Sequence, residues 1–400
     1  MVGYSANVNV GYFRILTTGQ ITLNRYPHAI TTGTDAADKI TDTNWHHVIA
    51  TMNGDSNGKI YIDGVEVGLS INNVVNDIVL DILGARGNNE SDHFDGKKFL
   101  NIGGVQSKGF LDVIRWMVSR DHGPWTKNYE TEVGEKPAAV SDSLTITFVN
   151  HSTFLIQWKE LNILTDPIWS DRCSPFSFAG PQRMRPPGLK FEDLPSIDIV
   201  LLSHNHYDHL DLPTLLMLEE AHQPTFIVPL GVKAYLDEND IKNTMEMDWW
   251  GEIDNRIKIT SVPAQHFSSR GMFDRDQTLW CGYVLEADQR KLYFAGDTGY
   301  GDFFKEIGEK LGPMDVSLIP IGAYLPKWFM SPIHVSPEEA IKIHKDVKSK
   351  QSVAMHFGTF PLADDGMGRA EEDLLLAIEN SKITQEAFLI PSEGTPLTFD

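Results

Sequence analysis

Residues 204–209 read His-Asn-His-Tyr-Asp-His and concentrate side chains that bind metals within six positions. Imidazole nitrogens and carboxylate oxygens are ligands that zinc prefers. A lone histidine on a strand is usually a core residue, but so many polar groups in one short loop are costly to bury unless a cation compensates them. The loop therefore predicts part of a metal site, with His204 and His206 on one side and Asp208 and His209 on the other.

The same arrangement, an apolar strand followed by a metal-binding side chain, occurs at four places. Segment 197–202 precedes the loop, and three more apolar segments, 257–262, 291–295 and 352–355, precede His266, Asp297 and His356. Open α/β sheets hold their ligands beyond the carboxyl ends of strands. Asp297 stands between small residues, and its two oxygens can serve different cations. Four such strand ends predict a two-metal site rather than core packing.

Composition limits the class of protein. The chain has 400 residues, which suggests two or three domains, and a formal net charge of −21. This balance argues against a nucleic-acid-binding protein, since phosphate backbones require clustered Lys and Arg. Cys173 and Cys281 form neither a disulfide framework nor a CxxC metal motif. No signal peptide or transmembrane segment is visible, so we expect a cytoplasmic or peripherally membrane-associated protein.

Residues 1–88 are expected to form a small all-β domain. Short alternating apolar runs are separated there by Asn-Gly and Asp-Gly turns, which is typical of antiparallel strands. Segment 45–52 running into 58–67 resembles the central hairpin of laminin-G-like, concanavalin-type jelly rolls, and 82–86 resembles a later strand. Only about half of such a domain is present. Its uncovered edges predict packing against the rest of the chain or against another copy, as a homo-oligomer.

Residues 89–400 have the pattern of an α/β domain. A helix is expected first, with an apolar stripe formed by Phe110, Val113, Ile114 and Met117. A connector containing Pro and Gly follows at 123–139. Beyond it, strand-like and helix-like stretches alternate to the end, which indicates sheets covered by helices.

This second part closely resembles the metallo-β-lactamase superfamily, and within it the branch of phospholipases D that hydrolyse N-acylphosphatidylethanolamine. The resemblance covers about residues 92–362, and the loop sequence Leu-Ser-His-Asn-His-Tyr-Asp-His-Leu-Asp is its most specific part. It also rests on segments 151–156, 164–172, 179–183, 294–300, 319–324, 334–340 and 356–360. The implied fold is an αββα sandwich of two mixed sheets flanked by helices.

The resemblance implies a dinuclear zinc site and a reaction. The first zinc would be held by His204, His206 and His266, the second by Asp208, His209 and His356, and Asp297 would bridge them. A hydroxide between the ions would attack the phosphorus of a glycerophospholipid, releasing an N-acylethanolamine. Asp208 and His334 are the candidate catalytic residues, the latter for positioning or proton transfer. Asp166 is expected to orient a metal-binding imidazole, with His151 as a supporting residue.

Substrate recognition is expected from two loops beside the metals. Loop 170–189 contributes Ser177, Phe178 and Arg183, and loop 324–330 contributes Tyr324 and Trp328. Their aromatic side chains would admit acyl chains, contact a bilayer surface or form a buried lid. Arg183, with Arg185 and Lys190, offers positive charge for a phosphate or belongs to a solvated basic loop. Ser177 and Phe178 depart from the Gln and Tyr that lipid-cleaving relatives commonly have.

Two other functions remain compatible with the sequence. A lactonase or ester hydrolase would use the same two-metal site, because a metal-activated hydroxide attacks carbonyl carbon as well as phosphorus. Alternatively, the N-terminal β domain would bind a glycan or a protein, with the hydrolase as a passenger.

Overall fold

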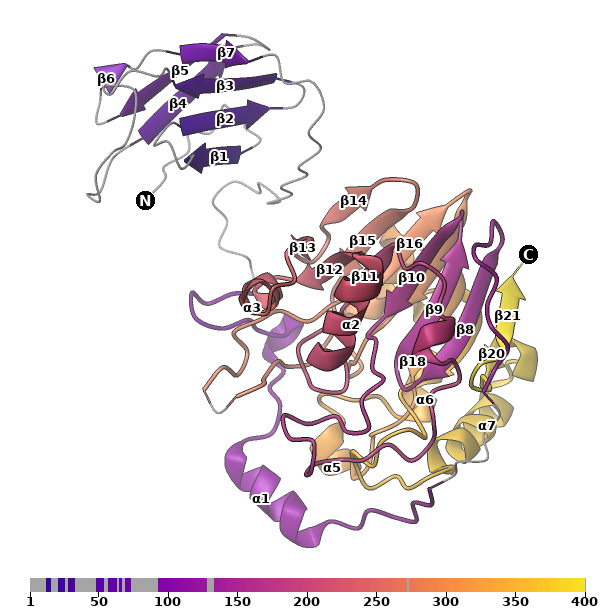
Figure 1. The fold of residues 1–400 in the computed structure, drawn as a ribbon. Helices are drawn as coiled ribbons and strands as arrows, with labels where there is room; N and C mark the ends of the chain where they lie inside the picture. The colour runs from indigo at the N-terminus through magenta and orange to yellow at the C-terminus, as the bar shows by residue number, and fades with distance from the viewer. Residues whose placement is uncertain are drawn as a thin grey trace. The chain divides into compact units, whose positions relative to one another are not determined.

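The computed structural model describes strands within residues 12–72, and then residues 93–127, 133–271 and 273–399 (Figure 1). By its contacts the chain divides into two compact units, Met1–Glu90 and Ser91–Asp400. The expected domains, residues 1–88 and 89–400, stay a prediction.

The first unit contains two antiparallel sheets. One has the strand order β1-β2-β3-β7 and the other β4-β5-β6. Their bounds are β1 Tyr12–Ile15, β2 Ile21–Arg25, β3 His28–Thr32, β4 Val48–Asn53, β5 Asn57–Ile62, β6 Val65–Glu66 and β7 Leu69–Asn72. Pairing of β4 with β5, from Val48 opposite Ile62 to Asn53 opposite Asn57, confirms the hairpin expected at 45–67. The strand expected at 82–86 lies outside the described residues.

Two seven-stranded sheets form the second unit. The first sheet has the order β13-β12-β11-β10-β9-β8-β21, and the second has the order β14-β15-β16-β17-β18-β19-β20. The first comprises β8 Leu144–Asn150, β9 Thr153–Trp158, β10 Leu161–Thr165, β11 Ile199–Leu201, β12 Thr225–Pro229, β13 Thr244–Met247 and β21 Pro396–Phe399. The second comprises β14 Glu252–Asp254, β15 Lys258–Val262, β16 Gly282–Ala287, β17 Arg290–Phe294, β18 Met314–Pro320, β19 Ser349–Met355 and β20 Phe388–Leu389. Both mix parallel and antiparallel pairs.

Helices flank these sheets (Figure 1). They are α1 Phe110–Ser119, α2 Leu212–His222, α3 Val232–Glu238, α4 Phe303–Lys310, α5 Lys327–Met330, α6 Pro337–Asp346 and α7 Arg369–Ser381, with 3-10 turns η2 Ile102–Gly104, η3 Phe191–Asp193 and η4 Gln385–Ala387. Helices α2 and α3 share one apolar cluster with the first sheet, while α6 packs on β18, β19 and α7. This arrangement confirms the αββα sandwich.

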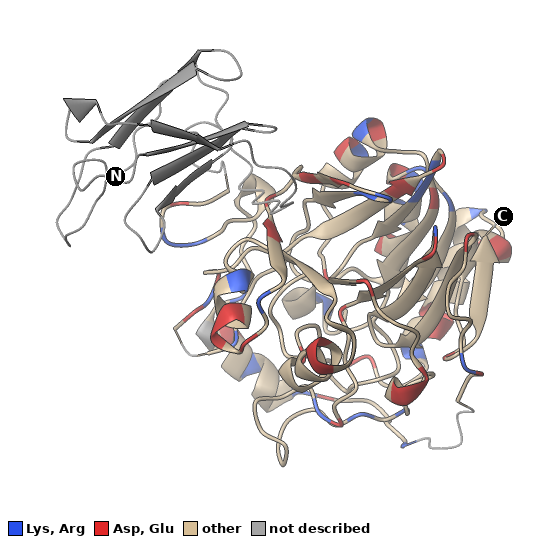
Figure 2. Cartoon of the chain, turned by 45° about the horizontal axis from the view of Figure 1, so that its top comes forward, with Lys and Arg blue, Asp and Glu red and all other residues tan. Residues whose placement is uncertain are grey.

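The chemistry of the strands explains why the sheets are internal. Strands β8 to β12 contain no charged residue, and nearly all of their side chains are buried. Parallel strands that are covered on both faces have continuous apolar sequences, as in Ile199–Leu201. Asp, Glu, Lys and Arg lie mainly on helices, loops and outer strands (Figure 2). The ends of the inner strands are therefore the places where buried polar groups gather.

Two helices near the site differ in detail from the expectation. The sequence predicts a helix that opens at His334, but α6 begins at Pro337 with a capping box between Ser336 and Glu339, so His334 lies in the preceding turn. Helix α1 is present, but Ile114 and Met117 are 42% and 65% exposed. Its packed face is instead formed by Val113 and Trp116, which lie against Phe329 and Met330. The apolar stripe predicted from the sequence was thus partly wrong, because it left out Trp116, which packs against Phe329 and Met330.

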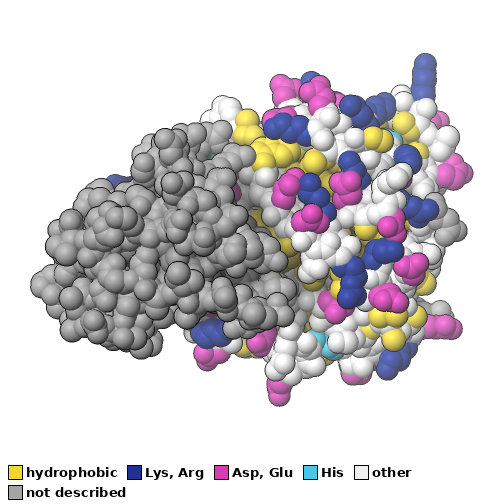
Figure 3. Space-filling view, turned by 90° about the horizontal axis from the view of Figure 1, so that it is seen from above, with side chains coloured by type: hydrophobic (Ala, Val, Ile, Leu, Met, Phe, Trp, Pro, Cys, Tyr) yellow, Lys and Arg dark blue, Asp and Glu magenta, His cyan; other side chains and the backbone are white. Residues whose placement is uncertain are grey.

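None of the described helices is long and apolar enough to cross a membrane. Figure 3 shows one face of the molecule, and on its described part positive and negative side chains are interspersed. That face gives no support to binding of a nucleic-acid backbone, which requires positive charge gathered in one area.

Candidate metal centre

The metal-binding side chains predicted from the sequence meet between the two sheets. Residues 204–209 follow β11 of the first sheet. His266, Asp297 and His356 follow β15, β17 and β19 of the second sheet. The two layers face each other, so the ends of strands that are far apart in sequence supply one cluster. Every side chain of this set, apart from the partly accessible His206 and Asp208, is buried.

Three imidazoles form the first group. His204 Nε2 lies 2.8 Å from His206 Nδ1, and His266 Nε2 lies 3.2 Å from the same nitrogen. The far nitrogen of His266, Nδ1, lies 2.8 Å from the carbonyl oxygen of Ile333. Donation of that N–H leaves the Nε2 lone pair directed at the group, which is the usual orientation of a metal-binding histidine.

The second group combines histidines with a carboxylate. Asp208 Oδ2 lies 3.3 Å from His209 Nε2, 3.4 Å from His356 Nε2 and 2.9 Å from His151 Nε2. The ligand atoms of these four residues all lie within 4.8 Å of one another. The structure therefore places His151 directly in the group, where it contacts the carboxylate of Asp208.

Asp297 connects the two groups. Its Oδ2 lies 3.1 Å from both His209 Nε2 and His356 Nε2, and 3.8 Å from His266 Nε2. The same oxygen is 3.8 Å from Nδ1 of His334. An oxygen placed between both histidine groups is positioned to bridge two cations.

The donor set fits divalent cations. Among the described residues, His209 Nε2 and Asp297 Oδ1 are buried without a hydrogen-bond partner. Buried polar atoms are normally satisfied, and leaving one unpaired is costly. Binding of zinc or a similar ion by these nitrogen and carboxylate oxygen atoms would offset the cost of burying them.

The buried carboxylate of Asp166 contacts both histidine groups, one of them through Ser203. Its Oδ2 lies 2.6 Å from His209 Nδ1 and accepts a hydrogen bond from the Ser203 hydroxyl at 2.6 Å, while Oδ1 accepts from the Ser203 backbone N–H at 2.7 Å. Ser203 Oγ in turn lies 2.9 Å from His204 Nδ1. One buried carboxylate therefore fixes a histidine of each group, His209 directly and His204 through Ser203.

Left-handed backbone brings three of these residues into place. His151, Asp166 and His356 have φ angles of 48°, 35° and 59°. Such values are uncommon for residues with a side chain and occur at functional sites where surrounding contacts maintain them. The His356 N–H donates to the carbonyl of His151 at 2.7 Å, which ties the two sheets together next to the cluster.

The first group is electrically neutral at ordinary pH. Burial and neighbouring imidazoles hold the pKa of His204 and His266 well below its usual value. Burial lowers the pKa of His206 to about 4. Their unprotonated nitrogens are therefore available as ligands.

The second group and Asp297 pair two carboxylates with two imidazoles. Burial favours the neutral form of Asp208 and Asp297, but the facing imidazoles outweigh it and hold the pKa of both carboxyls well below its usual value. Burial likewise disfavours charge on His209 and His356, yet the carboxylates raise the pKa of His209 well above its usual value and that of His356 to about 9. The carboxylates thus attract positive charge, which a cation would supply.

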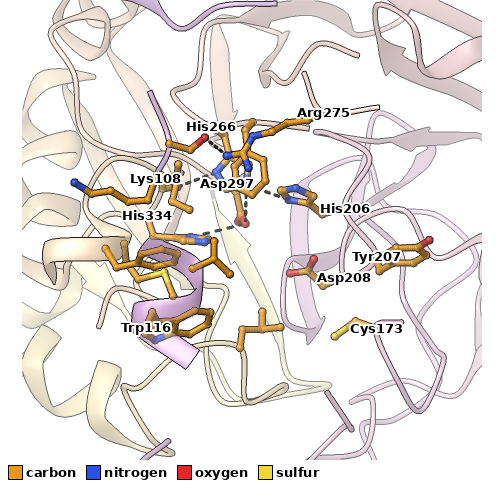
Figure 4. Close-up of a pocket in the computed structure, with 17 residues that line it drawn as sticks. Lys108, Trp116, Cys173, His206, Tyr207, Asp208, His266, Arg275, Asp297 and His334 are labelled. Carbon is orange, nitrogen blue, oxygen red and sulfur yellow. Dashed lines mark hydrogen bonds and ion pairs between the residues drawn. The ribbon is translucent and has the colours of Figure 1, made fainter. Parts of the chain in front are cut away.

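The cluster opens into a cavity of about 360 Å³ (Figure 4). His206, Asp208, His266, Asp297 and His334 form its polar end. The remaining wall is largely apolar or aromatic and comes from α1, α5 and four loops, with Val113, Trp116, Tyr207, Phe267, Phe329, Met330, Ile333 and Leu362. A polar reactive end beside an apolar wall suits a substrate with a reactive polar group and a hydrocarbon part.

The substrate-binding residues expected from the sequence do not line this cavity. Arg183 is buried, donates to the carbonyls of Ile168 and Ser170, and stacks on Phe360, so it supports the loop rather than offering charge to a phosphate. Tyr324 is also buried, and its hydroxyl donates to Asp373 at 2.5 Å.

The three others lie on the surface. Phe178 is 80% exposed, Ser177 lies exposed beside it, and Trp328 is 39% exposed with Arg115 over its ring. The neighbours of Trp328 in the chain, Phe329 and Met330, reach the cavity instead. The role of Ser177, Phe178, Arg183, Tyr324 and Trp328 in substrate binding stays a prediction.

The remaining wall residues were missed for different reasons. Tyr207 and Phe267 stand next to predicted ligands, and that adjacency was a usable signal. Trp116 lies on the predicted helix, and a different choice of the helix positions that face the interior would have included it. Lys108 and Arg275 occur in loops with no distinguishing pattern, and only the fold brings them to the cavity.

Comparison with known proteins agrees with this geometry. Residues 161–357 match the family described as the Beta-lactamase superfamily domain. A UPF0173 metal-dependent hydrolase of Methanopyrus kandleri is 30% identical over 241 residues, which are 58% of this chain and 94% of that protein. The chain belongs to the metallo-β-lactamase superfamily. This confirms the family resemblance that the sequence indicated.

Other metallo-β-lactamase superfamily members are more similar over part of their length. The N-acyl-phosphatidylethanolamine-hydrolyzing phospholipase D 1 of Caenorhabditis elegans is 43% identical over 54% of this chain and 64% of its own. A mitochondrial enzyme of that name from Saccharomyces cerevisiae is 36% identical over 58% of this chain and 51% of its own. The chain thus spans about half to two thirds of these relatives.

The fold and the N-terminal part are matched separately. An isothiocyanate hydrolase from Delia radicum gut bacteria has a TM-score of 0.52 at 20% identity, covering 64% of this chain and 100% of that one. It shares the metallo-β-lactamase fold. Residues 4–97 match the Concanavalin A-like lectin/glucanases superfamily, which confirms the resemblance of the N-terminal strands to laminin-G-like domains.

Removal of bound metal is expected to lower the thermal stability of the protein. A ligand present at about a thousand times its Kd stabilises the folded state by about 4 kcal/mol, which corresponds to a shift of several degrees in Tm. Melting should therefore be compared before chelation, after chelation and after addition of zinc. An unchanged Tm in all three samples would show that the cluster is stable without a cation.

Proposed function

We propose that this protein is a zinc-dependent phosphodiesterase of phospholipase D type that hydrolyses N-acylphosphatidylethanolamine-like glycerophospholipids. The observation that carries this proposal is the pair of histidine groups joined through Asp297 at the polar end of an apolar cavity. His204, His206 and His266 would hold one zinc ion, and Asp208, His209 and His356 the other, with Asp297 between them. The phospholipase D names of the worm and yeast relatives support the substrate class.

Two bound zinc ions would supply a water molecule that is ionised near neutral pH and would neutralise charge on the phosphoryl oxygens. The protein's own groups position that chemistry. Asp208 is held by His151, and the histidines are oriented by Asp166 and by the Ile333 carbonyl. Positioning of this kind is a large part of catalysis, because groups held in place need no reorganisation during the reaction.

His334 is suited to deliver a proton to the leaving oxygen. Its side chain lines the cavity, and its Nδ1 is buried without a hydrogen-bond partner among the described residues. The same nitrogen is 3.8 Å from Asp297, at the edge of the metal cluster. Burial lowers the pKa of His334 to about 4, so near pH 7 the imidazole is neutral and would pass a proton on through its own N–H rather than carry an extra one.

The apolar wall supports contact with lipid. Helix α1 turns Val113 and Trp116 towards the cavity, while Leu111 and Val118 on the same helix are 79% and 86% exposed. Helical spacing places Leu111 and Val118 on the face of α1 opposite Val113 and Trp116, and exposed apolar side chains of this kind favour contact with a hydrocarbon phase. We propose that α1 touches the bilayer surface while a lipid enters the cavity.

Hydrolysis in water enriched with ¹⁸O tests the proposed reaction. The purified zinc-loaded protein is incubated with N-acylphosphatidylethanolamine in detergent micelles, and the products are identified by mass spectrometry. Attack at phosphorus places the label in phosphatidate and releases unlabelled N-acylethanolamine. Release of labelled fatty acid instead would contradict the proposal and identify an ester hydrolase, and cleavage of an acyl lactone would identify a lactonase.

His334→Gln is expected to lower kcat by about 10²- to 10⁴-fold, the usual contribution of a general acid or base. Zinc content should stay that of the parent protein, because the other ligands remain. Steady-state kinetics and metal analysis on the same sample measure both quantities. His122→Gln, which changes an exposed histidine, is the matched control. Loss of zinc from the His334 variant would instead make this residue a metal ligand.

A further inference from the structure

Arg275 stands between two cavities. The cavity that contains the metal cluster shares a wall with a second cavity of about 440 Å³, and the shared residues are Ser107, Lys108, His266, Phe267 and Arg275. The second cavity is more polar, with Asp95, Lys98, Asn101, Gln106 and Asp276 in its lining. A substrate that is bound at the metal cluster and extends into both cavities would therefore lie beside Arg275.

The guanidinium of Arg275 is held in place from three sides. Its Nη2 donates to the Ser107 hydroxyl, and its Cζ lies 4.7 Å from the centre of the Phe267 ring. Its Nε lies 3.8 Å from Asp276 Oδ2. Figure 4 shows the side chain of Arg275 extending to the side of the cavity where His266 lies. An arginine fixed in this way presents its remaining N–H groups with little loss of conformational entropy.

Two lysines, Lys98 and Lys108, share the lining of these cavities with Arg275. Asp276 faces two cations, since its Oδ2 lies 3.7 Å from Lys98 Nζ and 3.8 Å from Arg275 Nε. One carboxylate cannot balance both. Lys108, on the same wall, makes no ion pair within the described residues. The three cations gather on the wall of Arg275, while Asp208 and Asp297 lie at the metal cluster, so this wall offers positive charge to an anion although the chain carries a formal charge of −21.

We infer that Arg275 is the residue that selects an anionic substrate, by donating to the non-bridging oxygen of a phosphodiester bound at the metal cluster. This inference rests on the proposed phosphodiesterase function. Guanidinium groups bind phosphate oxygens through charge-assisted hydrogen bonds, whereas a neutral ester has no charged oxygen to accept them. Arg275 thus contributes to substrate specificity rather than to the reaction that carboxyl and phosphoryl esters share.

Two small substrates with the same leaving group test this role in the full-length, zinc-loaded protein. Bis-p-nitrophenyl phosphate carries a negative charge, and p-nitrophenyl acetate does not. Arg275→Gln should raise KM for the phosphodiester by about 10- to 100-fold, the usual effect of losing a hydrogen bond to a charged group. The kcat for the phosphodiester and both constants for the acetate should stay within about twofold.

Further variants separate recognition from folding. Arg275→Lys should retain part of the affinity, and Arg256→Gln, an exposed arginine on the β14–β15 turn, should behave as the parent protein. Increasing ionic strength should raise KM for the phosphodiester less in Arg275→Gln than in the parent protein. Equal losses on both substrates, or an unchanged KM for the phosphodiester, would overturn the inference.

Inhibition distinguishes this inference from the proposed function. If the parent protein cleaves the acetate but no phosphodiester, the proposed function fails. Dimethyl phosphate is then tested as a competitive inhibitor of acetate hydrolysis. A Ki that is at least tenfold higher in Arg275→Gln supports anion selection by Arg275, and an equal Ki in both proteins rejects it.

Discussion

The Asp297→Asn variant is expected to lose hydrolytic activity by about a thousandfold or more and to bind fewer metal ions than the parent protein. Asp297 is the group placed between both histidine clusters, and Asn has nearly the same shape without the charge. Stabilisation by metal ions contributes several kcal/mol to the transition state, and each 1.36 kcal/mol corresponds to about tenfold in rate. Metal content per chain and kcat/KM measured on one preparation check both parts.

The same substitution at a nearby exposed aspartate serves as the control. Asp302→Asn changes a largely exposed carboxylate that pairs with Lys305 at the surface, so activity and metal content should not change. Circular dichroism should show that both variants are folded. If Asp297→Asn kept the full metal content and activity of the parent protein, Asp297 would not be the bridging ligand.

The Asp166→Asn variant is expected to weaken zinc affinity by about 10- to 100-fold, although Asp166 touches no metal in the proposed arrangement. The Asp166 carboxylate contacts His209 Nδ1 and accepts two hydrogen bonds from Ser203. Asn offers one neutral oxygen in place of the carboxylate. The ring orientation of His209 and, through Ser203, that of His204 are then no longer fixed with a lone pair directed at the metal site. Competition with a chromophoric chelator measures the affinity.

Zinc titration distinguishes this positioning role from a purely structural one. Activity of Asp166→Asn should recover as free zinc is increased, whereas a misfolded protein would not recover. Ser203→Ala removes the hydroxyl that connects Asp166 to His204 but leaves the contact of Asp166 with His209, and it should produce a smaller loss. Asp171→Asn, an exposed carboxylate on the following loop, should have no effect. Unaltered zinc affinity in Asp166→Asn would show that neither histidine depends on this contact.

The parts of the site that could be predicted from the sequence are those governed by local rules. A strand such as Ile199–Leu201 is recognisable from its apolar run, and a polar group at its end, such as His204, then has few reasons to be there other than function. Asp166 could be predicted for the same reason, because it follows β10 directly. The capping box of α6 was also readable from Ser336 and Glu339 alone.

The cavity wall could not be predicted in this way. Its side chains come from α1, α5 and separate loops, and their meeting depends on packing that leaves no periodic pattern in the sequence. Arg183 illustrates the same limit, since its charge suggested a phosphate contact, whereas in the structure its Nε and Nη2 donate to backbone carbonyls in the interior. Arg275 carries the same charge in a loop with no motif, and it is the arginine that reaches the cavity.

Because the ligands come from both sheets, synthesis of the chain sets the order in which the site can be completed. The three imidazoles of the first group are all present once His266 has been made, but the second group requires His356, which lies nearly nine tenths of the way along the chain. Strands β20 and β21, which border the second and first sheets, come later still. The two groups of side chains therefore become available in a fixed order during synthesis, the imidazoles of the first group before the completed second group.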